Sequence, residues 1–480
     1  MRWAIHRLLV TLAIAFVFGK GQLAAGHAAL AWPEVGQLSA SHLFYQEASL
    51  LLEGNVQATH ALGKLSADRM ELFFDGTAEG AHIARSVLEG DVKLFSSDGR
   101  TRLYCQKATY EAATHQLTCH GKEHLPVLVI QELAAERSFE ARGQALRLWL
   151  DPEEPSEGSF PTFQLVGDLL LSWQLEGGQQ LRLHGHALTN CDEELRPTVG
   201  WYCTAAPGES CWLFADQRQA IGCATELLFF PMEERLVAYE LQGWLWREGS
   251  AEPLRCASEA AVWSQERGEL QLLGETLLQE SGGGQLFCKG EISLYGFERL
   301  EGGAVWPLLS GSGLLLCQQP APLLAELFCH GQFETEAAPP RLCLKSLRPE
   351  KISYLQGPFE LYGDRLQLEW FPSPLELKKL VVKGDVEGVH WTAEGEPQTL
   401  LAGMAEYCPK EQLLLLSSWA SQPVVYEEPA QGLRATAPRL LLQQEPLSQR
   451  LRIQGGGHVC FTFRRTPAGG LPQLLPTPPP

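Results

Sequence analysis

The chain has 480 residues, of which 45% are hydrophobic and 20% are charged, and its formal net charge is −19. This length allows about two to four domains and excludes a mini-protein, and the composition excludes a disordered chain and a polytopic membrane protein. The excess of acidic residues argues against duplex nucleic acid as a partner, because phosphate binding needs a basic face.

The N-terminus has the pattern of a secretory signal. Arg2 and Arg7 precede the apolar stretch Leu8 to Phe18, and Ala29 and Ala31 offer small residues for a signal peptidase. An uncleaved anchor is the weaker alternative, because the apolar stretch spans only about half of a hydrocarbon core of about 30 Å. We therefore expect residues 1–31 to be removed and the mature chain to lie outside the cytoplasm.

Strand signals dominate the rest of the chain. Few windows keep a helical period before Gly or Pro intervenes, whereas apolar and polar residues alternate from Arg365 to Trp370, as a half-buried strand requires. The sequence therefore predicts an all-β fold.

A short motif recurs along the chain: an apolar residue, any residue, Gly, Asp or Asn, and an apolar residue. It occurs around Gly54, Gly90, Gly167 and Gly384. Asn55 follows the first of these glycines, and an aspartate follows each of the other three. We expect each glycine to lie at a bend or bulge, with Asp or Asn supporting the local turn.

A second repeated segment reads as a strand and lies between copies of the first. Two strands are too few to bury their own apolar face, so successive units must stack. The second segment occurs at Leu65 to Phe74, Leu103 to Tyr110, Leu254 to Trp263 and Leu433 to Leu440. The expected modules are residues 40–130, a diverged region 131–350, residues 351–465 and a disordered Pro-rich tail 466–480.

The clearest copies resemble a known family. Leu88 to Val92, followed by Cys105 to Glu111 and Leu117 to Gly121, is similar to the OstA-like family. That family includes the periplasmic lipopolysaccharide-transport bridge and the N-terminal domain of an outer-membrane assembly protein. The resemblance implies a β-jellyroll of repeated short antiparallel strands, here two or three stacked modules, with an apolar interior that shields acyl chains.

The resemblance also implies a function. It indicates a periplasmic, non-enzymatic protein without cofactor or metal, which binds lipopolysaccharide and bridges its transport to the outer membrane. Its expected partners are lipopolysaccharide, other transport proteins that continue its β-edges, and further copies of itself. The alternative is a structural envelope protein, crosslinked by disulfides and without lipid cargo.

Residues that alternate inward are the candidates for lipid contact. Burial of an acyl chain is favourable by about 0.8 kcal/mol per CH₂, so an apolar groove holds such chains. The alternative is that these residues fill an ordinary sandwich core. The candidates are Met70, Leu72, Phe74, Val92, Leu94, Leu366, Leu368 and Trp370.

The 13 cysteines include no C-x-x-C pair, which argues against thioredoxin-like and zinc-ribbon sites. Pairs that flank expected turns are candidates for disulfides across a hairpin, provided that both side chains share a face. The remaining cysteines are read as buried thiols, and the odd total leaves one available for an intermolecular bond. The candidate pairs are Cys105 with Cys119, Cys203 with Cys211, and Cys317 with Cys329.

Three further patterns bear on catalytic chemistry. His120, Glu123 and His124 match the H-x-x-E-H spacing of a zinc protease, but Gly121 and Pro126 break the helix that such a site needs. Gly282 to Gly284 reads as a hairpin turn and Ser310 to Gly313 as a flexible loop. The sequence therefore predicts no catalytic residue.

Overall fold

The chain divides into two compact units in the computed structural model. Unit 1 comprises residues 1–251 and 260–267, and unit 2 comprises residues 252–259 and 268–480. The expected signal peptide up to residue 28 and the expected tail 466–480 lie outside the described residues. The structure describes residues 29–32, 36–46, 48–60, 63–77, 80–96, 98–134, 137–149, 162–175, 180–192, 196–215, 220–245, 253–280, 283–295, 308–319, 325–336, 341–347, 349–357, 359–370, 377–391, 395–419, 422–444 and 451–463.

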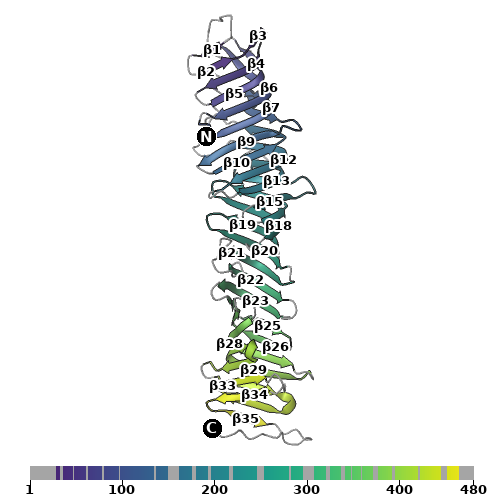
Figure 1. Cartoon of the computed structure of the whole chain (residues 1–480), viewed down its shortest axis with the longest axis vertical. Helices are drawn as coiled ribbons and strands as arrows, with labels where there is room; N and C mark the ends of the chain where they lie inside the picture. The colour runs from purple at the N-terminus through teal and green to yellow at the C-terminus, as the bar shows by residue number, and fades with distance from the viewer. Residues whose placement is uncertain are drawn as a thin grey trace. The chain divides into compact units, whose positions relative to one another are not determined.

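The described residues form antiparallel β-strands joined by turns (Figure 1), which confirms the all-β fold class. The described helices are short 3₁₀ turns: η1 (Ala112–Thr114), η3 (Pro409–Glu411) and η4 (Pro429–Gln431). The first of these is the turn expected between Cys105 and Cys119.

The strands of unit 1 follow one another along the chain, and neighbours in sequence are mostly neighbours in the sheet. They are β1 (Ala29–Trp32), β2 (Gly36–Ser39), β3 (His42–Gln46), β4 (Ser49–His60), β5 (Gly63–Thr77), β6 (Gly80–Ser96), β7 (Thr101–Glu111), β8 (Gln116–His120), β9 (Val127–Ala134), β10 (Arg137–Gly143), β11 (Ala145–Trp149), β12 (Thr162–Gln174), β13 (Gln180–Cys191), β14 (Pro197–Thr204), β15 (Cys211–Ala215), β16 (Ala220–Ala224), β17 (Glu226–Phe230) and β18 (Arg235–Leu245).

Strand β19 (Leu254–Ser264) is divided between the two units, and the strands after it belong to unit 2. They are β20 (Glu269–Gln279), β21 (Gln285–Tyr295), β22 (Leu308–Gln319), β23 (Ala325–Glu336), β24 (Arg341–Ser346), β25 (Ile352–Gln356), β26 (Phe359–Gly363), β27 (Arg365–Trp370), β28 (Leu377–Trp391), β29 (Pro397–Cys408), β30 (Leu413–Ser417), β31 (Val424–Glu428), β32 (Leu433–Ala437), β33 (Arg439–Gln444), β34 (Leu451–Gly456) and β35 (Cys460–Phe463).

Each unit has two arms that meet at a corner, because its long strands pair with different partners in their two halves. The first half of β7 pairs with β9, whereas its second half pairs with β8. In unit 1 the first arm contains β3, β8, β11, β14 and β17, and the second contains β2, β9, β10, β15 and β16. In unit 2, β24, β27, β30 and β33 lie in one arm, and β25, β26, β31 and β32 lie in the other.

The repeated Gly-Asp motif lies at this corner, which confirms the predicted bend. The strand register shifts by a bulge at each copy, as between Glu89 and Val92 of β6. Gly90 has a φ of 75° and Asp91 a φ of 41°, and the other copies have the same left-handed pair of residues. Asp and Asn tolerate this conformation better than other side chains, which explains why they follow the glycine.

In unit 2 glycines also pair across several strands. Gly274 lies opposite Gly290, Gly290 opposite Gly313, and Gly313 opposite Gly331. A Cβ atom on Gly290 or Gly313 would lie 2.9 Å from the Cα atom of the other. The row lets neighbouring backbones approach closely. Ser310 to Gly313 therefore belong to strand β22, and the flexible-loop interpretation was wrong, because alternating small residues here fit a tightly packed strand. By contrast, Gly283 and Gly284 lie in the connection between β20 and β21, as expected of a hairpin turn.

Candidate functional site

The residues predicted to contact lipid face the interior of their units. Six are buried, with exposed fractions from 0 to 6%, and two are half-buried. They come from both ends of the repeated pattern: Met70, Leu72, Val92, Leu94, Leu366 and Leu368 are buried, and Phe74 and Trp370 are half-buried. Their inward direction follows the alternation in sequence, whereas contact with lipid stays a prediction.

A continuous row of buried residues crosses the first arm of unit 1, because directly opposed residues on successive strands share the inner face. It begins at Leu52, Met70 and Leu88, which are 1 to 3% exposed. The row continues through Ala108, Cys119, Leu146, Leu165, Leu188, Cys203, Leu227 and Ala238.

The second arm of unit 1 carries a matching row. Leu38, Ala58, Leu65 and Leu94 open it, and none of the four is more than 3% exposed. It continues through Leu103, Val129, Ala141, Leu171, Leu183, Leu213, Gly222 and Gly243. The two rows line the interior between the arms with apolar groups over the whole unit.

Unit 2 repeats this arrangement. Both rows consist of apolar residues, glycine, cysteine and two tyrosines, and no charged residue belongs to either. One row runs through Leu272, Ile292, Gly311, Phe333, Leu344, Leu366, Val382, Ala405, Leu416 and Leu440. The other runs through Leu278, Leu286, Cys317, Leu327, Tyr354, Leu361, Gly388, Leu400, Tyr426 and Ala435.

The interior of unit 1 also holds an aromatic cluster that the sequence reasoning missed. The rings of Trp173 and Phe229 meet edge to face with centroids 4.1 Å apart, and Trp201 lies 5.6 Å from Phe229 and 4.9 Å from Phe139. Such pairs add to the stability gained from burial alone. The alternation of Leu171 and Trp173 along β12 could have predicted that Trp173 faces the interior. Its aromatic partners could not have been predicted, because they lie on strands far away in the sequence.

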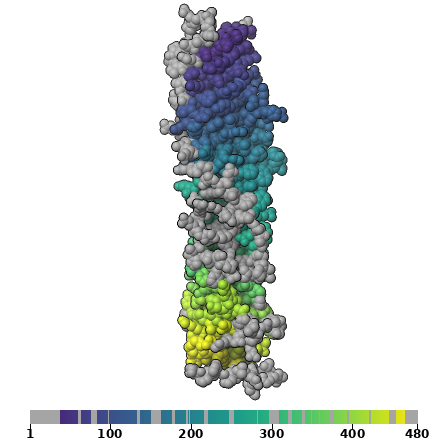
Figure 2. Space-filling view, in the orientation of Figure 1, coloured from purple at the N-terminus to yellow at the C-terminus, as the bar shows by residue number. Residues whose placement is uncertain are grey.

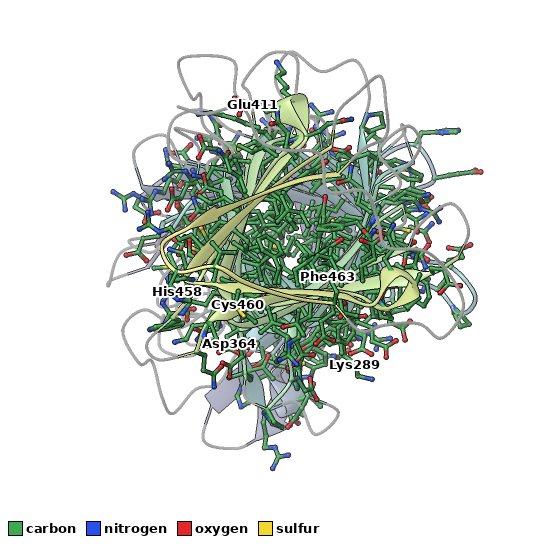
Figure 3. All side chains as sticks on the ribbon, turned by 90° about the horizontal axis from the view of Figure 1, so that it is seen from below. Lys289, Asp364, Glu411, His458, Cys460 and Phe463 are labelled. Carbon is green, nitrogen blue, oxygen red and sulfur yellow. The ribbon has the colours of Figure 1, made fainter. Side chains whose placement is uncertain are left out.

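The rows are packed by the protein's own side chains. On the face shown in Figure 2, the purple and blue strands of unit 1 form a surface without a visible opening. In the end-on view, Lys289, Asp364 and Glu411 of unit 2 lie outside the carbon-rich middle of the picture (Figure 3). Burial raises the pKa of Cys256 to about 12 and that of Cys329 to about 11, so these thiols stay neutral.

The cysteines of the three predicted pairs differ in their geometry. All are free thiols in the structure, so disulfide formation stays a prediction. The Sγ atoms of Cys203 and Cys211 lie 3.9 Å apart, where Gly185 leaves room for both sulfurs. Contact with the Cys105 thiol raises the pKa of Cys119, whereas Cys317 and Cys329 are diagonal neighbours on β22 and β23.

The H-x-x-E-H string lies in the turn between β8 and β9. Lys122 and Leu125 form a β-bridge there, and His120, Glu123 and His124 are all exposed. The two histidines therefore do not share a helical face, as the glycine and proline in this segment predict.

Strands with an unpaired edge occur at both ends of the described sequence. Within the described residues, strand β3 pairs only with β4, and its Phe44 and Tyr45 are 50% and 68% exposed. In the part of the chain that the structure describes, strand β35 pairs only with β32, and its residues, including Cys460 and Phe463, are exposed (Figure 3). An unpaired edge with exposed apolar side chains is a template for another strand.

No protein-family model matches the chain, and a search of curated proteins finds no match. In the part of the chain that the structure describes, no helix has the length and apolar character needed to cross a membrane.

Proposed function

We propose that the chain is a periplasmic lipopolysaccharide carrier, which holds acyl chains between the arms of its β-units and bridges their transport to the outer membrane. The observation that carries this proposal is the pair of inward-facing, mostly buried rows in each unit. Both rows are free of charged side chains and continue from strand to strand, so neighbouring positions offer an acyl chain similar surroundings.

Similar neighbouring positions matter for transport. An acyl chain of ten carbons gains about 8 kcal/mol on leaving water, at about 0.8 kcal/mol per CH₂. A single deep site would retain the lipid, whereas a row of equivalent sites binds it without fixing it at one strand. The rows in each unit have this property, because Leu, Val and Ala recur at opposed positions.

Entry of a lipid requires the arms to separate. The strand pairings among the described residues join neighbouring strands within an arm, and none crosses the interior. Separation at the side opposite the corner therefore breaks side-chain contacts but no backbone hydrogen bonds. An acyl chain restores the apolar contacts that the side chains lose.

Photo-crosslinking in the native envelope tests the proposal. A diazirine analogue of leucine at Leu72, Leu94 or Leu368 keeps the size of the buried side chain and reacts with whatever touches it. We expect lipopolysaccharide adducts at these positions, detected with an antibody against the glycolipid after denaturing electrophoresis.

The matched control places the same analogue at outward Lys93 or Glu387, where no acyl adduct is expected. Equal labelling of inward and outward positions, or adducts to protein alone in a folded chain, would remove the interior as the lipid site.

A second candidate function rests on the terminal strand. Cys460 is exposed on β35, beside Phe461 and Phe463, which are 48% and 44% exposed. These features suit a structural envelope protein whose edges pair and whose thiols crosslink. Intermolecular disulfides through Cys460 in native envelopes, together with the absence of lipid adducts, would favour this function.

A further inference from the structure

Three cations stand in a row on the outer face of unit 2. Lys345 of β24 lies directly opposite Arg365 of β27, and Arg365 lies directly opposite Lys383 of β28. All three side chains are exposed. Within the described residues, none of the three has a carboxylate within ion-pair distance.

This row departs from the pattern on the rest of the surface. Lys107 lies opposite Glu89 with a separation of 2.7 Å, and Lys289 lies opposite Glu275 at 2.9 Å. Like charges directly opposite each other destabilise a sheet, so three in succession cost stability. In a chain with a net charge of −19, such a row indicates an anionic ligand.

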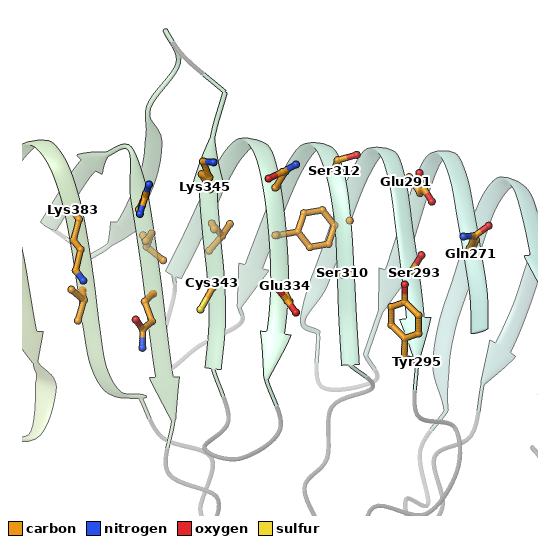
Figure 4. A pocket seen from close by; sticks show the side chains of 18 of the residues that line it. Gln271, Glu291, Ser293, Tyr295, Ser310, Ser312, Glu334, Cys343, Lys345 and Lys383 are labelled. Carbon is orange, nitrogen blue, oxygen red and sulfur yellow. The ribbon is translucent and has the colours of Figure 1, made fainter. Parts of the chain in front are cut away.

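The cations line one end of a groove of about 760 Å³ (Figure 4). This volume lies within the range of small-molecule sites and far exceeds the size of a phosphate ion. The floor is hollowed because small side chains, Ser293, Ser310 and Ser312, occupy positions that glutamine or glutamate takes on neighbouring strands.

Hydroxyl and amide groups are the most frequent polar groups in the remaining lining. Gln332 lies opposite Lys345 and Ser312 on its two sides, and Gln367 lies opposite Cys343. These groups donate and accept hydrogen bonds, as sugar hydroxyls do. The acidic residues Glu269, Glu291 and Glu334 lie on strands β20, β21 and β23, to one side of all three cations.

We propose that this groove binds a phosphorylated oligosaccharide, with its phosphate over Lys345, Arg365 and Lys383 and its sugars along the serine floor. Strands are spaced about 4.8 Å apart, so side chains on adjacent strands converge on one phosphate. The Arg365 guanidinium matches two phosphate oxygens at once. The headgroup of the proposed glycolipid cargo is one source of this ligand, but the site does not depend on lipid in the interior.

A phosphorylated sugar fits this groove better than an acidic peptide. Peptide grooves usually supply apolar pockets for anchoring side chains, whereas the apolar lining residues Phe333, Leu344, Leu366 and Val381 are at most 8% exposed here. The serines and glutamines between them are the groups that a ligand would meet. The acidic side chains further along the groove would also repel a second acidic residue of a peptide. A neutral sugar ring faces no such repulsion.

Titration calorimetry on the full chain tests the proposal. The probe is the phosphorylated core oligosaccharide of lipopolysaccharide after removal of its fatty acids. We expect binding that weakens with added salt, and a loss of affinity of about tenfold in Arg365→Gln, because one charge-assisted contact disappears. Lys345→Gln and Lys383→Gln should act in the same direction.

Lys289→Gln is the matched control, because it removes an exposed and paired lysine of the same unit. It should leave the affinity unchanged. Thermal unfolding separates binding from folding: Arg365→Gln relieves like-charge repulsion, so its unfolding midpoint should not fall. A lowered midpoint would mean that the cations support the fold, which contradicts a ligand role.

Further binding measurements identify the ligand. Absence of binding, or equal binding after enzymatic removal of the phosphates, would overturn the proposal. Equally tight binding of inorganic phosphate alone, or of a polyglutamate peptide, would also overturn it, in favour of a simple anion site or a protein partner. Equal affinity for the deacylated oligosaccharide and intact lipopolysaccharide would support recognition of the headgroup, whatever crosslinking in the interior shows.

Discussion

At the scale of single residues, the corner glycines explain where each long strand bends. Gly90 has a φ of 75°, and a Cβ atom built there would lie 2.8 Å from the Cβ of Asp68 on β5. Gly99 has a φ of 70°, but a Cβ atom there meets nothing within 4 Å. Substitution at Gly99 therefore introduces backbone strain alone, whereas substitution at Gly90 adds a steric clash.

Gly90→Ala should lower the free energy of unfolding by about 2 to 3 kcal/mol, from strain plus displacement of Asp68, whereas Gly99→Ala should cost only about 1 kcal/mol of strain. Urea unfolding monitored by circular dichroism measures both. Equal effects would mean that the close approach to Asp68 has no energetic weight.

The Cys203 and Cys211 thiols are placed for oxidation. Their Sγ atoms need to approach by about 2 Å to reach the length of a disulfide bond. Oxidised glutathione would take up the two electrons and two protons that the thiols lose, and is itself reduced to two thiols. The resulting short loop should stabilise the fold by about 2 to 3 kcal/mol.

Peptide mapping by mass spectrometry after oxidation should find Cys203 linked to Cys211, and more slowly, if at all, Cys317 linked to Cys329. Diagonal strand neighbours stand too far apart for an unstrained bond. Cys211→Ser should abolish both the link and the stabilisation. Recovery of unlinked Cys203 after full oxidation would contradict the prediction.

At the scale of strands, Glu369 pairs with two cations on neighbouring strands of unit 2. It lies on β27, and its side chain is 10% exposed. Lys378 of β28 lies 2.6 Å from its carboxylate, and Arg341 of β24 lies at 3.3 Å. The hydrogen bond from Lys378, followed by the attraction of both cations, lowers the pKa of Glu369 below its usual value of 4.5.

A carboxylate with a lowered folded-state pKa stabilises the fold above its unfolded pKa, and this contribution disappears as the pH falls through the folded value. Glu369→Gln should therefore reduce the free energy of unfolding by about 1 to 3 kcal/mol at pH 7, and the difference from the native chain should shrink below pH 4.5. Exposed Glu387, paired with Lys351, provides the control, and its Gln variant should cost about 1 kcal/mol or less. A pH-independent difference at Glu369 would exclude the ion pairs as its cause.

Local patterns in the sequence predicted the strands and the bends. The alternation from Arg365 to Trp370 gave β27, and the Gly-Asp motif gave the bulges, because both depend on neighbours along the chain. The cation row was not predictable, since Lys345 and Lys383 are far apart in sequence and meet only through the register of β27. The prediction of a flexible loop at Ser310 to Gly313 was wrong for the same reason, because the close approach of β21 and β23 decides the conformation of this segment.

At the scale of the whole chain, stability should be local. Most strands pair with strands nearby in sequence, so each unit consists of layers that contact mainly their neighbours. In such arrays the free energy is close to a sum of layer and nearest-neighbour terms. A perturbation in one layer should therefore weaken only the strands next to it.

Amide hydrogen exchange of Gly90→Ala measures this directly. Protection should fall in β5, β6 and β7, whose strands pair at the altered corner, and should be unchanged in β28 and β29 of unit 2. Gly99→Ala lies in the turn beyond β6 and serves as the control, with a smaller loss in the same strands. A uniform loss of protection across both units would show global cooperativity instead. A carrier whose arms separate one layer at a time would then be ruled out, because opening at one strand would unfold the whole chain.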